Sequence, residues 1–182
     1  MRYASGEPLH GVVTQSLQVH RDERGSFREI FKDLWGTPLH PTQWSVVHSR
    51  ENVLRGPHLH LEHDEYFLLL QGRAFVGLRD VRPGSPTRDR SCLIELTEDE
   101  ETAVIFPRGF LHGWYFPVQS THIQAVSQAY EEYHPHDNLG CLWSDPELEI
   151  PWPCRDPILA NRAGSFPPLS ALLERVSAAK LQ

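Results

Sequence analysis

Short apolar runs recur along the chain, separated by glycine, proline, aspartate and asparagine at intervals of roughly 8–12 residues. This spacing is typical of an antiparallel all-β sandwich or barrel, and each run has the length of an ordinary strand. Turn chemistry lies between several runs, for instance at Gln71-Gly72 and at Pro83–Pro86. The expected strands are Gly11–His20, Ser26–Phe31, Gln43–Ser49, Asp64–Leu70, Arg73–Asp80, Arg90–Leu96, Glu101–Phe106, Gly113–Phe116 and Thr121–Ser127.

The pattern changes after Tyr133, where a loop rich in proline, aspartate and tryptophan begins. Only Pro168–Leu181 has helical spacing, with leucines and a valine on one face, so one short C-terminal helix is expected there. We predict a single domain over residues 1–182, with a barrel core at about 11–128 and a C-terminal loop and helix at 134–182. A set of antiparallel strands of this number avoids unpaired edge strands by closing into a barrel or by stacking into a double-sheet jelly roll.

Composition narrows the class of partner. The 182 residues are 40% hydrophobic and 23% charged, and the net charge is −7 without a run of basic residues. This balance argues against a nucleic acid or an anionic membrane as the main partner. The N-terminus has no apolar signal core, so a cytoplasmic location is expected. The three cysteines are widely spaced and predict packing residues, not a disulfide framework or a zinc site.

The eleven histidines carry the candidate chemistry. His58 and His60 alternate and should share one face of a strand, and Glu65 can return to that face after a short bend. His112 follows a Pro/Gly turn. Three imidazoles and one carboxylate predict a divalent metal site for Zn, Fe, Ni, Mn or Co, with no organic cofactor. The alternative is that these histidines are satisfied by hydrogen bonds at a barrel mouth, with the carboxylate in solvent. His63, in the same loop, is a substitute ligand or proton carrier, and we expect it to be exposed.

The candidate metal ligands also match a known sequence pattern. The pattern H-x-H-x4-E-x6-G, followed by P-x-G-x2-H, resembles the two signature motifs of the cupin superfamily. The resemblance implies a double-stranded β-helix, or jelly-roll barrel, in which these four side chains are the metal ligands. Two positions depart from the motifs, at Asn52 and Phe116, and neither is a ligand position.

A second resemblance rests on Asp22–Glu29, Gln43, Val53–His58, Leu78–Thr87, Phe106–Gly113, Trp143–Pro146 and Ile150–Pro153. In this order, these segments resemble the dTDP-4-dehydrorhamnose 3,5-epimerase family. This resemblance implies a homodimer that acts on a 4-keto sugar attached to a nucleoside diphosphate, or on a related small molecule. It further implies that His58 is the base and that Arg24 and Arg55 bind the diphosphate, as guanidinium groups can; Glu29, Gln43 and His112 complete the substrate-binding set. Alternatively, Arg24 pairs within its turn and Arg55 is a surface charge.

Three positions depart from that family. Glu65 stands where the family has a lysine, Gln124 where it has a tyrosine acid, and Ala163 where an aspartate orients the base. Tyr130 and Tyr133 lie a few residues further on and are candidates for the missing acid, since epimerisation needs an acid to return the proton.

A carboxylate beside an enolate requires a cation, so the change at Glu65 also favours a metal. If His58 binds that metal through its lone pair, it cannot be the base as well. Tyr66, His63, Glu62 or a metal-bound hydroxide would then take the proton. The leading hypothesis is therefore a metal-assisted epimerase or isomerase of a nucleotide-linked 4-keto sugar. The alternatives are a metal-cupin oxygenase or lyase acting on a small organic acid, and a non-catalytic sugar-binding cupin.

Overall fold

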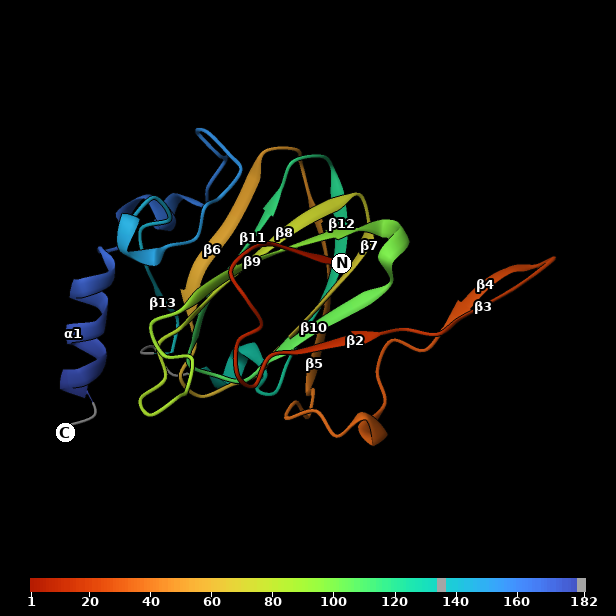
Figure 1. Cartoon of the computed structure of the whole chain (residues 1–182), viewed down its shortest axis with the longest axis horizontal. Coiled ribbons are helices and arrows are strands. Elements are labelled where there is room, and N and C mark those ends of the chain that lie inside the picture. Colours follow the sequence, from red (N-terminus) through yellow and green to blue (C-terminus); the bar gives the residue numbers. More distant parts are fainter. Residues whose placement is uncertain (134–136, 180–182) are drawn as a thin grey trace.

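Two antiparallel sheets form the body of the protein in a computed structural model that describes residues 1–133 and 137–179 (Figure 1). In spatial order, the first sheet contains β1 (Arg2–Ser5), β9 (Ser91–Thr97), β8 (Arg73–Asp80), β11 (Phe110–Phe116), β6 (Val53–Leu59) and β13 (Leu139–Gly140). The second contains β2 (Val13–Ser16), β10 (Thr102–Phe106), β7 (Glu65–Gln71), β12 (Ser120–Val126) and β5 (Gln43–Ser49). The predicted all-β jelly roll is confirmed.

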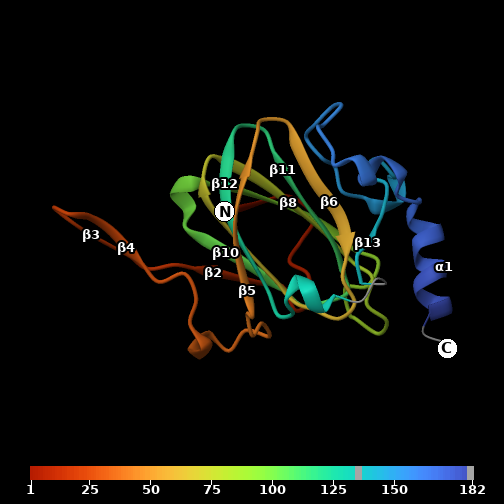
Figure 2. The same cartoon turned by 180° about the vertical axis from the view of Figure 1, so that it is seen from behind.

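The remaining elements are short. A two-stranded hairpin, β3 (Val19–Asp22) and β4 (Gly25–Arg28), projects from the barrel in both views (Figures 1 and 2). The one α-helix of the described residues, α1 (Leu169–Ala179), lies on the far side of the barrel from this hairpin. It is too short to cross a membrane, and no other described segment forms a helix that could. The 3-10 helices are η1 (Asp33–Trp35), η2 (Glu98–Glu100), η3 (Tyr130–Glu132), η4 (Pro146–Leu148) and η5 (Asn161–Ser165).

The central strands β7, β8, β10 and β11 are buried on both faces, which explains why their apolar runs in the sequence are nearly continuous. Phe67 of β7 joins an inner cluster between the sheets, whereas its neighbours Tyr66 and Leu68 face outward. Residues 30–39 cover that outer face. The C-terminal segment covers the outer face of the six-stranded sheet through Leu148, Ile150, Leu169 and Leu172. A strand buried on both faces loses the period-two alternation.

Most strands fall where they were predicted, and β5 and β8 have the predicted bounds. One prediction was wrong: 11–20 is not one strand, because β2 ends at Ser16 and β3 begins at Val19. Strands β1, β6 and β13 were not predicted, and the barrel therefore extends beyond the predicted core of 11–128. The predicted helix is confirmed at Leu169–Ala179, and its predicted end at Leu181 lies outside the described residues.

Candidate active site

The site lies between the two sheets, where β6, β7 and β11 meet. His58 of β6 is paired directly with His112 of β11, because these strands are neighbours in the six-stranded sheet. Glu65 opens β7 in the other sheet and faces inward, as Phe67 does two residues later. His60 follows the last residue of β6 on the same face as His58. The fold therefore brings the four predicted metal ligands together from both sheets.

The Glu65 carboxylate is the centre of the cluster. Three imidazole nitrogens surround its Oε1 atom: Nε2 of His60 at 3.6 Å, Nε2 of His63 at 3.5 Å and Nε2 of His112 at 3.5 Å. This oxygen is buried and has no hydrogen-bond partner among the described residues. Its companion Oε2 accepts a hydrogen bond from Nε2 of Gln124 at 3.1 Å. A buried acceptor without a donor is costly, so Oε1 is poised for a cation or a proton.

The same three histidines turn their other ring nitrogens toward acceptors. Nδ1 of His60 lies 2.6 Å from the carbonyl oxygen of Asp137, and Nδ1 of His63 lies 2.8 Å from Oδ2 of Asp137. Nδ1 of His112 lies 3.1 Å from the carbonyl oxygen of Phe110. A carbonyl or carboxylate oxygen only accepts, so each Nδ1 donates and each neutral ring keeps its lone pair on Nε2. With all three rings neutral, three lone pairs face one carboxylate oxygen, as in a metal site whose outer hydrogen bonds fix the ligands.

His58 differs from these three. Its Nε2 atom lies 3.2 Å from Nη2 of Arg162, and Nη2 also donates to Oδ1 of Asn138 at 2.9 Å. Arginine has no acceptor, so Nε2 of His58 accepts that bond. Burial, and then the neighbouring His112 and Arg162, lower the pKa of His58 from 6.5 to about 3. His58 is consequently neutral, and one of its ring nitrogens lies within 4.8 Å of one nitrogen each of His60 and His112.

The charges in the cluster favour a cation. Burial alone would raise the pKa of Glu65, but the imidazoles of His112, His63 and His60 outweigh it and lower that pKa to about 2. Burial likewise opposes protonation of His63, yet its hydrogen bond to Asp137 and the nearby Glu65 carboxylate raise its pKa to about 9. Burial lowers the pKa of His60 to about 4. The carboxylates of Glu65 and Asp137 both have lowered pKa values and remain ionised in the interior. Either a proton on His63 or a metal ion can balance their charge.

A cavity of about 270 Å³ opens beside this cluster. Arg55 lines it and is held by Ser49 Oγ (3.0 Å) and by the carbonyl oxygen of His48 (3.3 Å). Gln43 accepts a hydrogen bond from the backbone of Tyr130 at 2.8 Å. The cavity brings together the sequence-predicted residues Gln43, Arg55, His58, His60, Glu65, His112, Gln124, Tyr130 and Tyr133.

Two predicted positions need correction. Tyr66 was a candidate base, but it lies on the outer face of β7 with Phe31 and Trp44, where its hydroxyl donates to the carbonyl oxygen of Ile30 at 2.5 Å. It faces away from Glu65 because adjacent residues on a strand point in opposite directions. His63 was expected to be exposed, but it is fully buried and stacks on Tyr133 with ring centroids 4.3 Å apart.

Arg24 and Glu29 do not reach the cavity of their own chain. Arg24 is exposed on the projecting hairpin and pairs with Asp22, and Glu29 pairs with Lys32 just beyond it. In the single chain, Arg24 therefore pairs within its own turn, as the alternative interpretation predicted. Figure 2 shows the hairpin extending outward from the barrel.

Three residues of the site were missed. Asp137 follows residues 134–136, which lie outside the described part of the chain, and it binds His60, His63 and the loop between them. Asn138 and Arg162 line the cavity. At the position of the predicted orienting aspartate, Ala163 is buried, and its neighbour Arg162 contacts His58. The spacing of these residues carries no motif, so only the fold could reveal them.

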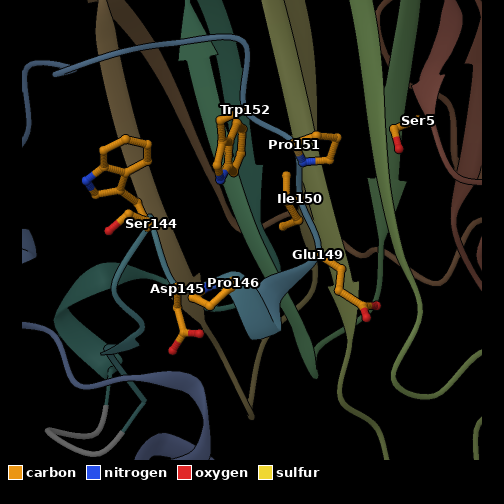
Figure 3. A pocket seen from close by; sticks show the side chains of 9 residues that line it. Ser5, Ser144, Asp145, Pro146, Glu149, Ile150, Pro151 and Trp152 are labelled. Carbon is orange, nitrogen blue, oxygen red and sulfur yellow. The ribbon is translucent and has the colours of Figure 1, made fainter.

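A larger hollow of about 500 Å³ lies elsewhere, on the outer face of the six-stranded sheet. Figure 3 shows that Asp145, Pro146, Glu149, Ile150 and Trp152 all come from one C-terminal segment that crosses the strands. Trp152 packs so closely on Gly77 that a Cβ atom there would lie 2.4 Å from its ring. This hollow lacks the imidazoles of the inner site and belongs to the cover of the sheet.

Comparison with known proteins decides the family. Residues 7–171 match the family model described as dTDP-4-dehydrorhamnose 3,5-epimerase. The chain belongs to this family. Members of the 3,5-epimerase family are isomerases of carbohydrate biosynthesis, and the sequence-based assignment to an epimerase-like isomerase is confirmed.

Individual relatives agree with this assignment. The dTDP-4-dehydrorhamnose 3,5-epimerase of Shigella flexneri is 31% identical over 153 residues, which cover 80% of this chain and 83% of the relative. Among solved structures, the rmlC epimerase of Mycobacterium tuberculosis is 27% identical with a TM-score of 0.82, covering 100% of this chain and 92% of that one. ChmJ, a 3'-monoepimerase from Streptomyces bikiniensis solved with dTDP-quinovose, is 26% identical with a TM-score of 0.81, covering 93% and 88%.

Proposed function

We propose that this protein epimerises a 4-keto sugar carried on a nucleoside diphosphate, in the cavity beside Glu65, with the help of a divalent metal ion. The observation that carries the proposal is a polar cavity in a member of an epimerase family, lined by Arg55, Gln43 and a cluster of imidazoles. A guanidinium group suits a diphosphate because it offers paired donors to phosphate oxygens. ChmJ, a structural relative, was solved with dTDP-quinovose, a ligand of this chemical class.

A metal fits the donor set of the cluster. Ligand bonds of about 2.1 Å in a tetrahedral site place the donor atoms about 3.4 Å apart. The distances of 3.5–3.6 Å between Oε1 of Glu65 and the nearby Nε2 atoms are close to that value. The sequence motif names His58, His60, Glu65 and His112 as ligands, and nitrogen and oxygen donors of this kind suit Zn, Fe, Ni, Mn or Co. When bound, the ion would act as a Lewis acid toward the 4-keto oxygen, in place of the lysine that the family has at Glu65.

The residues of the chain divide the remaining work. His58 stays neutral, as a base must before it takes a proton, and an anionic oxygen of the substrate would draw Arg162 away and free Nε2. Tyr133 is the candidate acid in place of Gln124. Burial, and then the charges of Glu65 and Asp137, raise the pKa of Tyr133, so it holds a proton to donate.

A homodimer would complete the site. The projecting hairpin carries Arg24 in its turn and Phe27 in strand β4, and the Phe27 side chain is 64% exposed. Edge strand β5 lies beside the cavity and exposes Trp44 and Val46 on its outer face. A second copy that received the hairpin near its cavity would gain Arg24 and Glu29 for the diphosphate, and the two apolar surfaces would leave solvent.

Proton exchange tests the proposed reaction. In heavy water, a dTDP-linked 4-keto-6-deoxy sugar should lose its proton signal at C3, or at C3 and C5, when the protein is added. The variant Arg55→Gln should weaken substrate binding, whereas Arg88→Gln, a change far from the cavity, should not. Thermal-shift screening with dTDP, UDP, GDP and CDP identifies the nucleotide, since a ligand at 100 times its Kd stabilises by about 2.7 kcal/mol. Binding without exchange would identify a non-catalytic sugar-binding cupin, and no response to any nucleotide would favour a small organic acid.

A further inference from the structure

We infer that His63, and not His58, is the third imidazole of the metal site, so that the ligands are His60, His63, Glu65 and His112. This assignment rests on the metal in the proposed function and departs from the motif, which names His58. It follows from where the donor atoms point.

The first observation is the pair of unpartnered atoms. Among the described residues, Nε2 of His63 and Oε1 of Glu65 are both buried, both without a hydrogen-bond partner, and 3.5 Å apart. The Nε2 atoms of His60 and His112 approach the same oxygen at 3.6 and 3.5 Å. Three imidazole nitrogens therefore lie 3.5–3.6 Å from one carboxylate oxygen, close to the separation that a small divalent ion imposes between two of its ligands.

The second observation is the different engagement of His58. Its Nε2 atom accepts from Arg162 at 3.2 Å, so the lone pair needed for coordination is directed to a guanidinium group. A cation beside that nitrogen would repel a metal ion. The His58 ring also packs edge-on against Phe166, with centroids 5.9 Å apart, on the cavity side of the cluster.

The third observation is the support behind the ligands. Asp137 holds His60 through its carbonyl oxygen at 2.6 Å and His63 through Oδ2 at 2.8 Å. Its Oδ1 atom also accepts from the backbone amide of Glu62 at 3.2 Å, which fixes the loop between the two histidines. One residue thus sets the tautomer and direction of two rings, as carboxylates behind metal-bound histidines do.

The assignment separates two roles that the motif gives to one residue. An imidazole that binds a metal cannot also take a proton from the substrate through the same lone pair. With His63 in the ligand set, His58 lines the cavity as a free base under the control of Arg162.

Metal binding to the full-length protein tests the inference without reference to turnover. Metal-free wild type, His63→Gln, His58→Gln and the control His40→Gln, an exposed histidine, are titrated with Co²⁺, and the visible absorption reports coordination. We expect one Co²⁺ per chain in wild type, His58→Gln and His40→Gln. In His63→Gln, affinity should fall by about 100-fold or more, since even outer-shell changes cost 10–100-fold. Retention in His63→Gln together with loss in His58→Gln, or no binding by wild type, overturns the inference.

Two further measurements test the inference even if the His63→Gln variant does not fold. Asp137→Asn retains His63 and removes the charge behind it, so Co²⁺ affinity should fall by about 10–100-fold if His63 is a ligand. In the Co²⁺ form of the wild type, hyperfine-shifted Nδ1–H signals should number three and persist in His58→Gln; disappearance of one signal in that variant contradicts the assignment. An active protein that binds no Co²⁺ overturns this inference and the metal assistance but leaves the proposed epimerisation standing, whereas an inactive protein that binds Co²⁺ through His63 overturns only the proposed reaction.

Discussion

Nη2 of Arg162 lies 3.2 Å from Nε2 of His58 and donates a hydrogen bond to it. A carboxylate at this place would orient the imidazole and stabilise its protonated form, which is what the family resemblance implies for an aspartate near residue 163. The guanidinium group does the reverse, because it favours the neutral ring. In the proposed reaction, His58 would therefore become reactive when an anionic oxygen of the substrate draws Arg162 away.

The variant Arg162→Gln should raise the pKa of His58. Removal of the positive charge takes away one cause of the lowered value of about 3, but burial is the larger cause and persists, so the new pKa should stay below 6.5. A proton NMR titration of the metal-free protein measures the shift, with Arg88→Gln as the control. An unchanged His58 pKa would show that the contact with Arg162 does not form in solution.

The variant Tyr133→Phe should slow proton exchange at the sugar by roughly 100-fold or more, the usual contribution of a positioned acid. Binding of the nucleotide should change little, because the hydroxyl is removed while the ring that stacks on His63 remains. Heavy-water exchange rates give the first quantity and calorimetric titration with dTDP gives the second. Tyr3→Phe, in strand β1, is the matched control, and equal rates for the two variants would assign the acid elsewhere.

Asp80 should make stability depend on pH in the acid range. Burial alone would raise its pKa, but hydrogen bonds from Arg82, Ser85 and Thr87 lower it from 3.8 to about 2. A carboxyl group with a lowered folded-state pKa stabilises the fold above its unfolded value and loses this contribution as pH falls toward 2. The contribution is on the order of 2 kcal/mol. Urea unfolding between pH 5 and 2, in about half-unit steps, should show this loss in wild type and a flatter profile in Asp80→Asn.

The packing of the C-terminal segment predicts a steric effect at Gly77. An added Cβ would lie 2.4 Å from Trp152 and 2.8 Å from Ile150, so Gly77→Ala should lower the free energy of unfolding by about 1–3 kcal/mol. Gly164→Ala is the control, since nothing lies within 4 Å of a Cβ there. Equal stability of the two variants in urea would mean that the segment does not press on the sheet as described.

Local patterning accounts for much of the fold. Strands bounded by turn residues, such as β5 and β8, were predictable because glycine and proline mark their ends. Strand β6 was missed because Gly56 and Pro57 interrupt it, and both residues usually end a strand. Gly56 has φ of +92°, and a Cβ there would meet the carbonyl oxygen of His112 at 2.6 Å, so the close pairing with β11 requires glycine.

The site was predictable to the extent that it follows the strands. The alternation of His58 and His60 and the position of Glu65 predicted that these side chains lie near one another, and they line one cavity. The partners of His58 and His63 could not be found in the same way, because Arg162 and Asp137 lie 104 and 74 residues away in sequence. Such contacts depend on how the C-terminal segment crosses the barrel. The same holds for Tyr66, whose residue type suited a base although its side of the strand did not.

Glu65 belongs to one sheet, whereas His112 belongs to the other and His60 directly follows one of its strands. Any opening of the sandwich therefore moves the carboxylate away from both rings at once. An ion bound to these side chains would cross-link the two sheets. Transient separation of the sheets would then also release the ion. The rate of amide hydrogen exchange in β7 and β11 would then measure how often the two sheets separate.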